Sequence, residues 1–222
     1  MENGQLENLY YGKVIRDRES FMHLHEAISR PLTSVCVPEP GVLSMEYTKQ
    51  EYPVYGTGDY RNPALSILQE NGSRIVNFTY VSHEIYQGKK SLSPLPAVYT
   101  NNEHEVCTLE ICLHDEVINT DLILSYTMFE EYPVITRNAK LVHKGEESIV
   151  LDRALSMSVE FQDMDFEMVH LSGAWARERY VKERKLEMGI QAVQGIHGTA
   201  GGAEHNPFLA LKRPCLLYTS PS

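Results

Sequence analysis

The sequence lacks a surplus of basic residues, a long apolar run and a dense set of cysteines. It has 20 Lys and Arg against 30 Asp and Glu, which gives a formal net charge of -10. The protein therefore has no excess of positive charge with which to bind the phosphate backbone of a nucleic acid. No stretch approaches the roughly 20 apolar residues of a membrane-spanning helix, and residues 1–20 show no basic start followed by an apolar stretch. The four cysteines include no C-x-x-C pair. We therefore expect a cytoplasmic protein that binds neither nucleic acid nor membrane.

Helical periodicity is also scarce, because only residues 21–28 and 176–186 could form two or three turns. Apolar residues instead recur at every second position, which is the period of a strand. Strands are predicted at 43–47, 75–80, 106–113, 121–129, 134–142, 148–151, 155–161, 166–171, 189–194 and 207–211. Gly- and Asn-rich turns separate them, and Asn71-Gly72 is a possible hairpin signal. The pattern predicts an all-β fold, a large antiparallel β-sandwich with few or no long helices.

No motif that carries intrinsic chemistry is visible. The sequence has no G-x-S-x-G elbow, no H-E-x-x-H helix and no P-loop. His23 and His25 would share one face of an extended segment, but two ligands do not close a tetrahedral metal site. The glycine-rich loop at 195–202 is followed by a strand pattern, whereas a phosphate cradle needs a helix. We expect no metal and no cofactor.

Two polar or aromatic positions stand out as candidates for ligand contact. Asp59 lies in a glycine-rich loop two residues before Arg61, where a carboxylate could accept hydrogen bonds from a ligand's hydroxyls; the alternative is a turn-capping aspartate. Trp175 is the only tryptophan and follows a predicted strand. Its indole could stack on a sugar ring or on a partner, or it could simply pack in the core.

Four segments together resemble a known family. Residues 2–12, 58–64, 173–179 and 205–211 are similar, in this order, to the amino-terminal region of bacterial α-galactosidases of glycoside hydrolase family 36. The resemblance implies a β-supersandwich domain over residues 1–214 that precedes a catalytic (β/α)₈ barrel. It also implies a chain that is truncated at both ends. Residues 215–222 do not resemble the family's continuation, and we expect them to be a frame-shifted or adapter-derived tail outside the fold.

The resemblance also implies an activity, a retaining cleavage of terminal α-linked galactose from melibiose- and raffinose-type oligosaccharides. Both catalytic aspartates of the family lie in the barrel, so no catalytic residue is expected in this chain and the chain alone is expected to be inactive. Asp59 and Trp175 match positions associated with sugar contact, and Arg61 and Arg177 are expected to orient the carboxylate or to pair with neighbouring acids.

The expected partners are α-galactoside oligosaccharides, the missing barrel of the same polypeptide and further copies of the chain in a homo-oligomer, a tetramer in the full-length enzyme. A different function remains open. A β-sandwich with 13 tyrosines could be a free-standing carbohydrate-binding module without catalysis.

Overall fold

A computed structural model describes residues 4–25, 48–56, 61–94, 97–195 and 204–214. The chain divides into two compact units, Met1–Glu160 and Phe161–Ser222. Antiparallel strands dominate both units, and the helical elements of the described ranges are two single-turn 3-10 helices, Met22–Leu24 and Glu103–Glu105. No helix in these ranges is long and apolar enough to cross a membrane. The predicted all-β fold is thereby confirmed.

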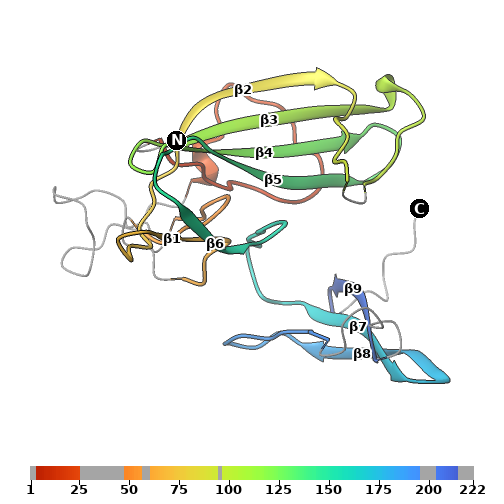
Figure 1. Cartoon of the computed structure of the whole chain (residues 1–222). Helices are drawn as coiled ribbons and strands as arrows, with labels where there is room; N and C mark the ends of the chain where they lie inside the picture. The colour runs from red at the N-terminus through yellow and green to blue at the C-terminus, as the bar shows by residue number, and fades with distance from the viewer. Residues whose placement is uncertain (1–3, 26–47, 57–60, 95–96, 196–203, 215–222) are drawn as a thin grey trace. The chain divides into compact units, whose positions relative to one another are not determined.

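The first unit contains a four-stranded sheet in the order β2-β3-β4-β5 and a two-stranded sheet, β1-β6 (Figure 1). Short turns join β3, β4 and β5, whereas the longer segment 88–105 joins β2 to β3, and each strand pairs with its neighbour along the chain. The strands of this unit are β1 (Leu65–Gln69), β2 (Thr79–Gln87), β3 (Val106–Asp115), β4 (Thr120–Phe129), β5 (Ile135–His143) and β6 (Ile149–Ala154).

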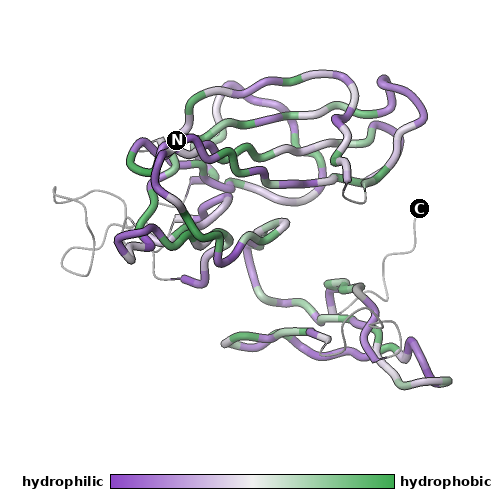
Figure 2. The backbone as a smooth tube through the Cα atoms, viewed as in Figure 1, coloured by the Kyte–Doolittle hydropathy of each residue, from purple (hydrophilic) through white to green (hydrophobic). Residues whose placement is uncertain are grey.

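The core of this unit lies on one face of the four-stranded sheet. Figure 2 shows hydrophobic and hydrophilic residues alternating along these strands, and the period of two turns the apolar set to a single side. Leu113, Leu122 and Leu124 of β3 and β4 are buried there against Leu65 and Ile67 of β1. The opposite face of the sheet carries the polar half of the alternation.

A polar network also joins the core face to the segment at 48–56. The Glu51 carboxylate accepts hydrogen bonds from the Tyr126 hydroxyl at 2.7 Å, from Asn8 Nδ2 at 2.9 Å and from the Arg137 guanidinium. Arg137 also donates to the carbonyl of Ser158 at 2.7 Å. Burial, followed by the charge of Glu51, raises the pKa of Tyr126, so its hydroxyl stays a donor. The network ties three distant segments to the sheet.

The second unit is a three-stranded antiparallel sheet in the order β8-β7-β9. Its strands are β7 (Glu167–Ala174), β8 (Arg177–Lys185) and β9 (His205–Lys212). Lys212 of β9 bridges Glu167 of β7 at 3.2 Å and Glu183 of β8 at 2.7 Å. All nine residues of the edge strand β8 are exposed.

The strand prediction was accurate for β3, β4, β5, β6, β7 and β9, although β6 (Ile149–Ala154) runs beyond the predicted 148–151. It missed β1 and was wrong in the segments described next. Residues 177–185 form β8 rather than a helix, because the tight turn after β7 brings them back into register with that strand. Residues 155–161 and 189–194 alternate in sequence, yet no strand forms there. Within 75–80 the ladder begins only at Thr79, although the alternation does bury Val76 and Phe78. The predicted strand at 43–47 lies outside the described residues.

Candidate functional site

Arg61 lies directly after the glycine-rich loop, beside two segments that are distant in sequence. Its Nη1 contacts Glu160 Oε1 at 2.7 Å, and its Nη2 donates to the carbonyl oxygen of Thr48 at 2.6 Å. The guanidinium is about one-third exposed, and it stays charged at any physiological pH. Asp59 itself lies outside the described residues. Arg61 therefore anchors the chain two residues after Asp59.

Trp175 occupies the turn between β7 and β8, and its side chain is 87% exposed. The core-packing alternative is therefore wrong for this chain. The turn is well defined, because Ala176 adopts a left-handed φ of 61° and its backbone N–H donates to Glu178 Oε1 at 2.9 Å. A fixed turn holds the indole out towards solvent, where its ring faces are open to a ligand or a partner.

Gly173 makes this turn possible. A Cβ atom at Gly173 would meet the carbonyl oxygen of Arg177 at 2.1 Å, far inside van der Waals contact. Arg177, the first residue of β8, lies opposite Ala174 in the ladder and is exposed. Trp175 and Arg177 thus share one short turn, whereas Arg61 belongs to the other compact unit.

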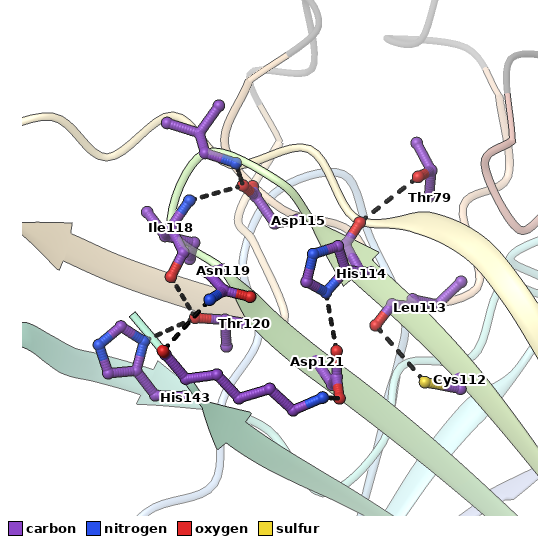
Figure 3. Close-up of polar contacts among 12 residues, drawn as sticks. Thr79, Cys112, Leu113, His114, Asp115, Ile118, Asn119, Thr120, Asp121 and His143 are labelled. Atoms are coloured by element: carbon purple, nitrogen blue, oxygen red, sulfur yellow. Dashed lines mark hydrogen bonds and ion pairs between the residues drawn. The ribbon is translucent and has the colours of Figure 1, made fainter. Parts of the chain in front are cut away.

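Titratable groups also gather at the tip of the β3-β4 hairpin, a feature that the sequence interpretation missed (Figure 3). The Asp121 carboxylate pairs with His114 Nδ1 at 2.7 Å and with Lys144 Nζ at 2.5 Å. Lys144, then His114, hold the pKa of Asp121 below its usual range. Asp115 is buried and accepts the backbone N–H groups of Val117 and Ile118, so it caps the hairpin turn. These contacts stabilise the hairpin.

The two histidines considered for a metal site, His23 and His25, belong to no group of metal-ligating side chains among the described residues. His25 Nδ1 instead bonds the Glu7 carboxylate at 2.6 Å. Across the described ranges, no three His, Cys, Asp or Glu side chains are grouped so that they could hold a metal ion. Residues 196–202 of the glycine-rich loop lie outside those ranges.

Comparison with known proteins decides the family. The sequence model of the glycosyl hydrolase family 36 N-terminal domain matches residues 4–216. The chain belongs to glycoside hydrolase family 36. It is 42% identical to α-galactosidase AgaA of Geobacillus stearothermophilus over 94% of its own length and 28% of that protein. It is 30% identical to α-galactosidase Mel36A of Lactobacillus acidophilus over 95% of its length and 29% of that protein.

Solved structures of family 36 enzymes share the fold. A variant of AgaA in complex with stachyose superposes with a TM-score of 0.89 at 40% identity, covering 97% of this chain and 30% of that one. The α-galactosidase of Lactobacillus brevis gives a TM-score of 0.91 at 32% identity, covering 97% and 29%. The chain thus spans less than one-third of the length of the family 36 enzymes that it matches.

This chain also forms a cavity that the sequence interpretation missed. A cavity of about 170 Å³ lies over the polar face of the four-stranded sheet. Its lining comes from four separate segments between residues 86 and 140. No local sequence pattern could have shown it, because the strand register brings these segments together.

Proposed function

We propose that this chain is the non-catalytic N-terminal domain of an α-galactosidase that removes terminal α-linked galactose from raffinose-type oligosaccharides with retention of configuration. The observation that carries the proposal is the match over residues 4–216 to the N-terminal domain of family 36. Relatives that share this region are named α-galactosidases, and structures of AgaA variants contain stachyose or raffinose. The reacting carboxylates would belong to a barrel elsewhere in the polypeptide, so the isolated chain would be inactive.

Within the complete enzyme, we propose that Asp59 and Trp175 contact the galactose unit. An ionised aspartate accepts hydrogen bonds from sugar hydroxyls, and an indole offers an apolar ring face. The 87% exposure of Trp175 on a fixed turn supports this role. Arg61 would position the Asp59 loop through its contacts with Glu160 and Thr48. Arg177 would act next to Trp175 in the same turn.

We further propose that residues 1–214 act as one domain against the barrel and within a homo-oligomer, with residues 215–222 outside the fold. The exposure of Tyr180 and Val181 in the edge strand β8, at 56% and 60%, supports a covering partner. A strand edge with unpaired backbone groups is a template for association, and these two side chains add apolar surface to an otherwise charged strand.

A chimera tests the proposed sugar contacts. Residues 4–214 of this chain would replace the matching region of AgaA, and raffinose hydrolysis would be measured for the Asp59→Asn and Trp175→Ala variants. Losing a charge-assisted hydrogen bond costs about 1.5–3 kcal/mol, so Asp59→Asn should lower kcat/KM roughly ten- to hundredfold. Losing the stacking contact of Trp175 should lower it by up to roughly tenfold.

Tyr99→Ala provides the matched control for the tryptophan variant, because Tyr99 is 89% exposed and lies in the other compact unit. Its kcat/KM should equal that of the parent chimera. Kinetics unchanged by Asp59→Asn would return Asp59 to a turn-capping role. Kinetics unchanged by Trp175→Ala would assign the indole to a partner surface rather than to the sugar.

A further inference from the structure

The cavity on the polar face of the four-stranded sheet has the build of a ligand site. Alternate residues of β3, β4 and β5 form its floor, and residues 89–92, which follow β2, form a wall. At the bottom, the buried hydroxyls of Thr108 and Thr127 bond to each other at 2.9 Å, and Thr108 also donates to the carbonyl of Gly88 at 2.6 Å. The wall is therefore fixed to the floor, and the cavity is preformed.

A charged pair lies in the middle of the cavity. Glu110, with a side chain 18% exposed, pairs with Lys90, and the hydroxyl of Ser125 donates to Glu110 Oε1 at 3.2 Å. Burial pushes the pKa of Glu110 up, but the hydrogen bond and charge of Lys90 outweigh it and hold the pKa below its usual value. Glu110 is therefore ionised, and a carboxylate has lone pairs left for further donors.

Three other side chains bring unused hydrogen-bonding capacity to the same cavity. The Tyr86 hydroxyl is shielded from solvent and lies beside Glu110 and Lys90, which influence its pKa, but none of the described residues makes a hydrogen bond of good geometry with it. A buried polar atom without a partner is costly, so its retention points to a ligand that satisfies it. Asn138 and Lys140 of β5 line the cavity as well and add amide and ammonium groups.

We propose that this cavity binds one sugar unit of an oligosaccharide through its hydroxyls. Donors and acceptors are interleaved over a small area, which matches a polyol whose hydroxyls both donate and accept. The ionised Glu110 in the floor opposes an anionic ligand. Each ordered water needs roughly 10–15 Å³ of such space, so a cavity of about 170 Å³ has room for one sugar ring. The site goes beyond the proposed function, because neither Asp59 nor Trp175 takes part in it.

Methyl NMR of the 222-residue chain tests the site, because Ile123 lies in the cavity floor. Titration with galactose and with raffinose should move the Ile123 δ1 methyl signal in a saturable way at millimolar sugar. The Ile67 methyl signal should stay in place, since Ile67 is fully buried in the core on the other face of the sheet. Inorganic phosphate, added as the anionic probe, should produce no saturable shift.

Two variants assign the binding to the cavity. Tyr86→Phe removes only the unpartnered hydroxyl and Asn138→Ala only an amide, and each should weaken sugar binding about fivefold, the effect of one hydrogen bond. Tyr99→Phe, outside the cavity, should leave binding unchanged. The proposal is overturned if no sugar moves Ile123, if phosphate binds in place of sugar, or if both cavity variants bind like the parent. None of these readouts depends on hydrolysis, so the proposed function stands or falls separately.

Discussion

Removing one partner of the buried charge pair between Glu51 and Arg137 should destabilise the first unit. The two side chains are 14% and 12% exposed, and Glu51 also accepts from Asn8 and Tyr126. Glu51→Gln keeps the shape but removes the charge, and its amide nitrogen is a donor that cannot accept the hydrogen bonds that a carboxylate oxygen accepts. Breaking a buried pair leaves the partner's charge uncompensated at a cost of 3–5 kcal/mol, and the residual exposure here places the expected loss at about 3 kcal/mol.

Urea unfolding followed by circular dichroism measures this loss, and thermal unfolding should show a midpoint roughly 6–12 °C lower for a chain of this size. Glu116→Gln is the matched control, because Glu116 is exposed beside the same sheet and its replacement should change the free energy of unfolding by less than about 0.5 kcal/mol. In a double-mutant cycle, Glu51→Gln and Arg137→Met should couple by at least about 1 kcal/mol. A loss below about 1 kcal/mol for Glu51→Gln, or additive variants, would refute the assignment.

Two further predictions concern the hairpins. Lys144 and His114 depress the pKa of Asp121 below its usual value of 3.8, so its stabilisation is present above pH 3.8 and disappears as pH falls through the depressed value. The difference in free energy of unfolding between the parent chain and Asp121→Asn should therefore shrink below pH 3.8, and a difference that is constant with pH would contradict this. Gly173→Ala should open the β7-β8 turn, because the new Cβ collides with the Arg177 carbonyl. Hydrogen exchange of the β8 amides should then be much faster, and unchanged protection would show that the turn adapts.

The sequence predicted most of the four-stranded sheet because its signals are local. Along 106–113, 121–129 and 134–142, alternation coincides with one buried face, and short turns leave each strand next to its neighbour in the chain. The errors arise in segments whose structure depends on pairing with residues that are distant in sequence. There, neither alternation nor a set of helix-favouring charged residues is enough to predict the structure. Residues 177–185 have helix-favouring Arg, Glu and Lys, yet β7 pairs with them.

The site was predictable only in part for the same reason. Trp175 could be placed in a turn after a strand, because the apolar alternation stops just before it. Its exposure, the contact of Arg61 with Glu160 and the cavity around Glu110 each depend on segments that are far apart in sequence. Family resemblance supplied the role of this chain in a larger enzyme, which no pattern within it encodes.

The most direct test of the account is an α-galactosidase assay on the purified 222-residue chain, run beside full-length AgaA and beside calorimetry with galactose. We expect no turnover of an α-galactoside above a heat-killed control, because we propose that the reacting carboxylates belong to a barrel elsewhere in the polypeptide. Turnover well above that control would contradict the central claim that this is a non-catalytic domain.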